Sequence, residues 1–198
     1  MLPLFRQIED AAIGCWALVR GIEAGAQRFD MSIDGFWRSF RWAFVLAALD
    51  ALDALSGHYQ TVGGDDTAAV GPGAIVWLLL VSAVASLITF CAFPLVVGAL
   101  AKPMALTKRY APYIIVRNWL LVFLSLPVYA IDALSALGVL SDSLRDPLVI
   151  LIVIITLFAG MAVARVLLTA SRSLAFGFAL LDFLMALLIG EAASRLIS

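Results

Sequence analysis

Long apolar runs separated by short polar segments are the dominant pattern along this chain. A helix needs about 20 apolar residues to cross a bilayer, and backbone polar groups in hydrocarbon must be paired within the segment, so runs of this length predict helices. The pattern therefore predicts an all-α membrane protein with five transmembrane helices, preceded by an amphipathic interfacial helix. The predicted spans of the transmembrane domain, residues 36–198, are 37–55, 73–100, 112–137, 147–169 and 173–197.

The predicted spans differ in how well they fit a bilayer. The first is the weakest, because its uninterrupted apolar stretch runs only from Trp42 to Leu49 before Asp50 and Asp53 follow. The second is longer than a bilayer requires, so we expect it to tilt, or to bend at Pro94.

Proline and polar residues mark where these helices begin and turn. Asp146 followed by Pro147 is typical of a helix N-cap and first helical residue, and Pro72 and Pro112 likewise stand where a missing N–H costs nothing. From Pro147 onward the chain is apolar for about 50 residues, more than twice one crossing. The polar segment 169–173 is therefore the predicted turn between the last two spans.

Residues 1–35 are predicted to form a cytoplasmic amphipathic helix. Apolar side chains recur at helical spacing, and the charged residues fall elsewhere on the helical wheel. The segment does not read as a secretory signal peptide, because Glu9 and Asp10 stand where an apolar core would begin. Two interpretations stay open: the helix packs beneath the bundle, or it senses the membrane surface or recruits a partner.

Composition narrows the class of protein. Of the 198 residues, 64% are hydrophobic and 14% are charged, far from the balance of a soluble domain. No basic stripe is present, so we expect no nucleic-acid partner. A disulfide between Cys15 and Cys91 is not expected, because the two residues do not share an oxidising compartment, and both are interpreted as packing residues. Arginine outnumbers lysine and alanine is abundant, a composition typical of GC-rich bacteria, which predicts a bacterial inner membrane location.

Positive residues are segregated along the chain. Those in the N-terminal segment, around the loop between the second and third spans and around the turn between the fourth and fifth make eleven of the thirteen, and only Arg145 and Arg195 lie on the opposite side. Cytoplasmic loops carry the excess of Lys and Arg. We therefore expect a cytoplasmic N-terminus and a periplasmic C-terminus. The first external loop agrees, since it has Asp65 and Asp66 and no basic residue.

Three acidic residues are predicted to gather at the external end of the bundle. Asp50 and Asp53 are three residues apart and so share a helix face, and Asp132 lies at the same end of the third span. Because ionisable groups within spans are costly, each is a functional candidate. Together they could form an outward-facing pocket for a cation or a proton; alternatively they are hydrated and only terminate their helices.

A second set of polar residues lies deeper in the predicted bundle. Asp182 falls near the middle of the last span, and Arg117 and Arg165 enter from the cytoplasmic side to comparable depth. We expect Asp182 to pair with one of these arginines, because an unpaired charge there would be costly. Such a pair holds the bundle together or, with Asn118 nearby, lines a cytoplasm-facing cavity.

No set of residues requires a particular reaction. His58 is the only histidine and is predicted to lie in a loop, and there is neither a P-loop nor a CxxC motif. We therefore expect no catalytic, cofactor-binding or metal-ligating residues and no enzyme activity. The first hypothesis for the function is an inner-membrane scaffold that contacts lipids and a homo-oligomer or membrane-complex partner through small-residue faces. The second is a small-solute or ion transporter that uses the intramembrane acids.

Three segments resemble the Yip1-type membrane proteins and related bacterial transporter-like proteins. They are FDMSIDGFWRSF at 29–40, KRYAPYIIVRNW at 108–119 and ARVLLTASRSLA at 164–175. The five-span organisation and the polar turn between the last two helices are part of the resemblance. It implies a non-enzymatic integral membrane protein that acts through lipid or protein partners, and it implies no catalytic residues.

Overall fold

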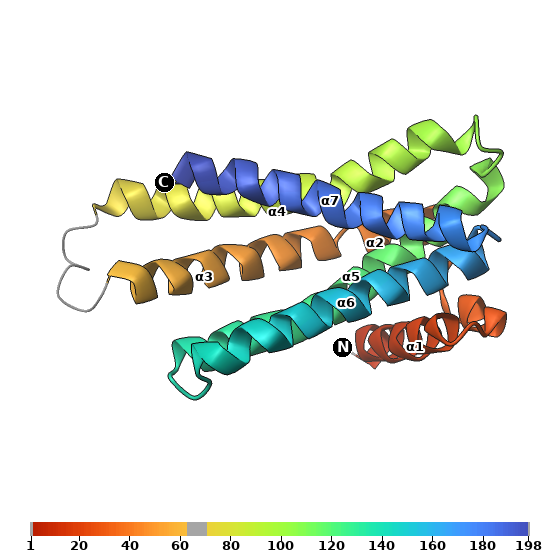
Figure 1. Ribbon diagram of the computed structural model, residues 1–198. Helices are drawn as coiled ribbons and strands as arrows, with labels where there is room; N and C mark the ends of the chain where they lie inside the picture. Colours follow the sequence, from red (N-terminus) through yellow and green to blue (C-terminus); the bar gives the residue numbers. More distant parts are fainter. Residues whose placement is uncertain (1, 63–70, 198) are drawn as a thin grey trace.

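The computed structural model describes residues 2–62 and 71–197, and in these residues the regular structure is entirely helical (Figure 1). The helices are α1 (Leu2–Val19), the 3₁₀ helix η1 (Glu23–Arg28), α2 (Ile33–Ser39), α3 (Trp42–Val62), α4 (Pro72–Ala101), α5 (Thr107–Ala136), α6 (Asp142–Leu167) and α7 (Arg172–Ile197).

The five long helices form a closed ring. Its order is α3, α4, α7, α6, α5, and each helix packs on its two neighbours. Helices that follow one another in the chain run antiparallel (Figure 1). The remaining elements lie outside the ring: α1 packs on α5, α6 and η1, and α2 packs on α5. The helix α5 is therefore covered on both sides, which makes it the most buried of the long apolar helices.

Four of these helices are long and apolar enough to cross a membrane. They are α4, α5, residues 143–167 of α6, and α7. The helix α3 has sufficient length, but Asp50 and Asp53 lower its apolar character and it is not among the four. The described residues are thus typical of a polytopic helical membrane protein with four candidate spans.

The first predicted span differs from the structure at both ends. Residues 33–39 form the separate helix α2, whose N-cap Ser32 accepts a hydrogen bond from the Gly35 amide through its Oγ atom at 3.1 Å. The helix α3 starts only at Trp42 and continues to Val62. The prediction that His58 lies in a loop is wrong, because this residue lies in the last turns of α3.

Two of the three proline start signals were misplaced. Pro72 does occupy the start of α4, after Gly71 as N-cap. However, α6 begins at Asp142 and α5 at Thr107, so Pro147 and Pro112 lie inside their helices. Each is the sixth residue, where the missing N–H removes a single bond near the helix start and is tolerated.

The N-terminal segment is not one continuous helix. Gly21, with φ +81°, ends α1: its amide donates to Leu18 O at 2.9 Å, and the Ile22 amide donates to Ala17 O at 2.9 Å. This Schellman geometry turns η1 back onto α1. The buried face of α1 includes Cys15, and burial raises the pKa of its thiol to about 12. This burial agrees with the interpretation of Cys15 as a packing residue.

The contact between α1 and η1 depends on glycine. A Cβ atom on Gly25 would lie 2.7 Å from Gly14 O and 2.8 Å from Ala17 Cβ. We expect Gly25→Ala to lower the free energy of unfolding by about 1–3 kcal/mol, because the backbone of α1 must move away. The matched control is Gly177→Ala in α7, whose Cβ meets nothing within 4 Å and should be neutral or stabilising by up to about 1 kcal/mol. Equal losses for the two variants, measured by thermal melting in detergent, would contradict this packing.

Candidate functional site

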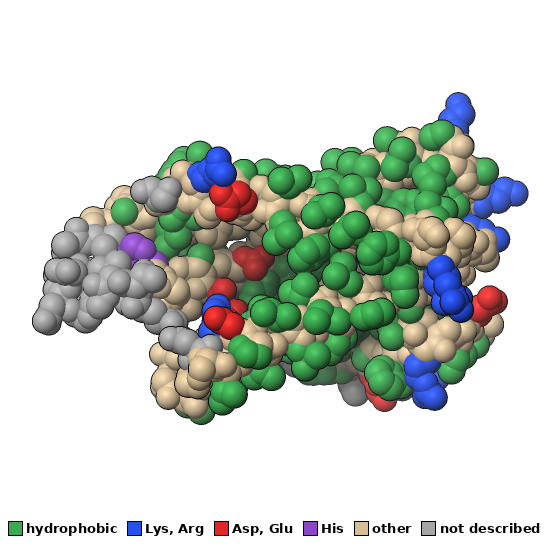
Figure 2. All heavy atoms as spheres, viewed as in Figure 1, with side chains coloured by type: hydrophobic (Ala, Val, Ile, Leu, Met, Phe, Trp, Pro, Cys, Tyr) green, Lys and Arg blue, Asp and Glu red, His purple; other side chains and the backbone are tan. Residues whose placement is uncertain are grey.

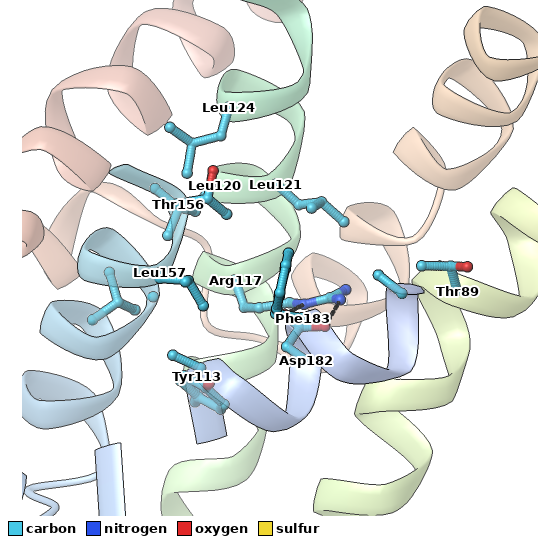
Figure 3. A pocket seen from close by; sticks show the side chains of 14 residues that line it. Thr89, Tyr113, Arg117, Leu120, Leu121, Leu124, Thr156, Leu157, Asp182 and Phe183 are labelled. Atoms are coloured by element: carbon cyan, nitrogen blue, oxygen red, sulfur yellow. Dashed lines mark hydrogen bonds and ion pairs between the residues drawn. The ribbon is translucent and has the colours of Figure 1, made fainter. Parts of the chain in front are cut away.

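A buried ion pair connects α5 to α7 across the ring. Of the two partners considered for Asp182, the structure has Arg117: Nε donates to Asp182 Oδ2 at 2.9 Å, and Nη2 donates to Oδ1 at 2.5 Å (Figure 3). The Arg117 side chain is 6% exposed and that of Asp182 is 26% exposed. Because α5 and α7 are not neighbours in the ring, this bidentate pair bridges its interior.

Arg117 has a second set of partners on α4. Its Nη1 donates to Phe90 O at 3.1 Å, and the guanidinium lies 5.5 Å and 5.1 Å from the ring centroids of Phe90 and Phe93. Pro94 has no N–H, so the carbonyl four residues earlier, that of Phe90, lacks its helical donor. Arg117 supplies that donor at the point where the sequence predicted a bend, and the ribbon of α4 changes direction along its length (Figure 1).

The other two residues of the predicted intramembrane site differ in burial. Asn118 is fully buried; its Nδ2 donates to Ser39 Oγ at 2.9 Å, and that hydroxyl donates to Phe36 O at 2.7 Å. Asn118 therefore holds the end of α2 against α5. Arg165 lies in the last turn of α6 and is exposed, so it takes no part in the pair.

The three external acids lie in one region, at the opposite end of the ring from α1. The Tyr129 hydroxyl donates to Asp50 Oδ1 at 2.7 Å, and Arg145 Nε donates to Asp132 Oδ1 at 2.7 Å. Asp53 lies within electrostatic range of both acids and of Arg145. The interpretation that all three acids are hydrated helix ends is wrong for Asp132, which is only 7% exposed. Asp65 and Asp66 lie outside the described residues.

Three cavities with shared wall residues lie inside the ring between Asp50 and the Arg117–Asp182 pair. Cavities of about 120, 210 and 310 Å³ all have Leu121 in their walls. The first contains Arg117 and Asp182, while the other two contain Asp50 and Tyr129. Figure 2 shows a hollow on this face with carboxylate side chains inside it. The interior of the ring is therefore hollow between the ion pair and the acids.

Several wall residues were missed because they carry no charge. Ser82, Ser86 and Thr89 follow one face of α4, and Ser125 and Tyr129 follow one face of α5. Spacings of three and four residues place such side chains on one side of a helix. Polar stripes within apolar spans are a signal that could have identified the cavity walls from the sequence.

Within residues 2–62 and 71–197, no group of three or more His, Cys, Asp or Glu side chains is placed to hold a metal ion. Asp50, Asp132 and Arg145 lie within electrostatic range of Asp53, and Arg145 also pairs with Asp146. Carboxylates therefore outnumber Arg145 in this group, and their field attracts positive charge.

These features define the class of an α-helical membrane protein whose mainly apolar interior holds a few polar side chains. The chain matches no family model, and comparisons with curated proteins and with solved structures also found no match. The resemblance to the Yip1-type proteins therefore stays a prediction from the sequence.

Proposed function

We propose that this chain is a non-enzymatic inner-membrane protein that admits a small solute or cation into the interior of its helical ring. The observation that carries the proposal is the series of adjoining cavities from Asp50 and Tyr129 to the Arg117–Asp182 pair. Ligand sites are typically concave, mainly apolar and supplied with a few convergent polar groups. Asp50 lies at one end of this series of cavities, and the ion pair lies at the other end.

The proposal includes α3 as a fifth crossing, with the N-terminus in the cytoplasm and the C-terminus in the periplasm. The helix α3 contributes Leu46 and Asp50 to the cavity wall. It packs on α4 and α5 along the same axis as the four apolar helices. In a ring of five helices Asp50 lies in the cavity wall and accepts a hydrogen bond from Tyr129, which lowers the cost that keeps α3 from resembling an independent span.

The scaffold hypothesis has weaker support in the packing. The scaffold hypothesis predicts that faces of small residues contact a helix of a partner. However, a Cβ on Gly160 would meet Ala179 of the same chain at 3.6 Å. Ala186 and Gly190 of α7 line the cavities. Gly160 thus packs on α7 of its own chain, and Ala186 and Gly190 border the interior, so the pattern of small residues does not require a second protein.

Cysteine labelling tests the proposal with two neighbouring residues of α5. Ser125 lines two of the cavities, whereas Leu126 is 48% exposed on the outside of the ring. With Cys91→Ala as background and Cys15 buried, we expect a charged, membrane-impermeant thiol reagent added from the periplasmic side to label Ser125→Cys. We expect it to leave Leu126→Cys unlabelled, because a thiol facing hydrocarbon does not ionise.

A further variant connects the labelling to the cavity itself. Gly190 shares a cavity with Ser125, and a Cβ there meets nothing within 4 Å. Adding Gly190→Leu should fill this space and slow the labelling of Ser125→Cys about tenfold or more, since 1.4 kcal/mol of hindrance already gives a factor of ten. Labelling of both positions at one rate, or of Leu126→Cys alone, would overturn the proposal.

A further inference from the structure

Another cavity lies outside the ring, between α1, the end of η1, α2 and α5. Its volume is about 500 Å³. Three arginines and two aspartates form its polar side: Arg6, Arg28, Arg38, Asp10 and Asp30. The opposite side is apolar: Leu4, Phe29, Ile115 and Trp119. The cavity is thus amphipathic, with an excess of positive charge.

The arginines of this cavity keep hydrogen-bonding capacity for a ligand. Arg28 Nη1 donates to Asp10 Oδ1 at 2.9 Å, and Arg38 Nη2 donates to Asp30 Oδ2. Each of these two pairings uses one of the five N–H donors of a guanidinium. The two side chains are 47% and 43% exposed, in contrast to Arg117, which is enclosed by several partners. An anionic group could therefore join both arginines without breaking either ion pair.

The apolar residues of the cavity indicate that the ligand has an apolar part as well as an anionic group. Ile115 and Trp119 are only 1% and 4% exposed, whereas Leu4, which is 51% exposed, offers apolar surface to a ligand. The outward face of α1 carries Phe5 and Trp16, which are 69% and 65% exposed and suit the boundary between headgroups and acyl chains. A free phosphate ion would use the arginines alone, whereas a lipid would also use the apolar side.

We propose that this cavity binds an anionic phospholipid, with the headgroup phosphate between Arg28 and Arg38 and the start of an acyl chain against Leu4, which is 51% exposed. Lys and Arg side chains gather mainly at the right-hand end of the molecule in Figure 2, toward which α1 lies in Figure 1. Basic pockets between helices at a membrane surface suit anionic headgroups, each basic residue contributing about 1 kcal/mol. Arg41, which shares an adjoining surface cavity with Arg38, adds to the positive field.

Native mass spectrometry of the purified full chain tests this site. The protein is titrated with phosphatidylglycerol and, separately, with phosphatidylcholine of the same acyl chains. We expect retained phosphatidylglycerol adducts and few phosphatidylcholine adducts. Arg28→Gln and Arg38→Gln should each weaken phosphatidylglycerol binding about fivefold, the factor that corresponds to about 1 kcal/mol.

The control variant is Arg20→Gln. It removes the same charge from an exposed position next to α1 that does not line the cavity, so phosphatidylglycerol binding should stay unchanged. Thermal melting in detergent identifies any variant that loses phosphatidylglycerol because it unfolds, and Arg28→Lys, which retains the charge, should keep most of the binding. Equal binding of the two lipids, an equal loss in Arg20→Gln, or displacement of the lipid by millimolar inorganic phosphate would overturn the proposal.

Discussion

Replacing Asp182 with alanine is expected to destabilise the protein by about 3–5 kcal/mol, the cost of leaving a buried arginine without its partner. Arg117 is 6% exposed and donates hydrogen bonds to both carboxylate oxygens of Asp182. The free energy of unfolding is measured by denaturant titration in mixed micelles. Glu191→Ala on the same helix is the control, because Glu191 is 61% exposed and its helical pair with Arg195 should contribute only about 0.5 kcal/mol.

The double change Arg117→Leu with Asp182→Ala should be more stable than Asp182→Ala alone, since it removes both charges. Recovery should be incomplete, because Phe90 O then has neither Arg117 nor a helical donor. Adding Pro94→Ala restores an N–H four residues after Phe90 and should stabilise the double variant more than it stabilises the wild type. Additive losses for Arg117 and Asp182 would show that the two residues do not act as a pair.

The sequence predicted the long helices and the ion pair through one physical rule, that lipid tolerates neither free backbone groups nor free charges. The choice between Arg117 and Arg165 did not follow from that rule. The two arginines have similar predicted depths in the membrane, but the sequence does not show which side of each helix faces the interior of the bundle. In the structure Arg165 is exposed at the end of α6, whereas Arg117 lies on the side of α5 that faces the interior.

Fewer of the residues that line the cavities could be predicted from the sequence. Considering only residues charged at neutral pH identified Asp50, Asp53 and Asp132 but not Tyr129, whose hydroxyl donates to Asp50. Arg145 was assigned to the external side, yet its contact with Asp132 depends on α5 and α6 being neighbours in the ring. Neither the order of helices in the ring nor the reversal at Gly21 follows from hydrophobic periodicity.

The proposed interior exists only if α3 crosses the membrane together with the four apolar helices. Without α3, the cavity that contains Asp50 would lose one wall and open to lipid. An odd number of crossings also has a direct consequence: the two ends of the described chain must lie on opposite sides of the membrane, whereas four crossings would bring them to the same side.

Sidedness reporters therefore test the central claim most directly. A periplasm-active reporter is fused after Ser198, a second is inserted at Lys108, and a third precedes the N-terminus, each with a matched cytoplasm-active reporter. Five crossings predict periplasmic activity after Ser198 and cytoplasmic activity at the other two positions, in agreement with the segregation of basic residues. Finding the N-terminus and the position after Ser198 on the same side of the membrane would contradict the crossing of α3 and, with it, the solute-accessible ring.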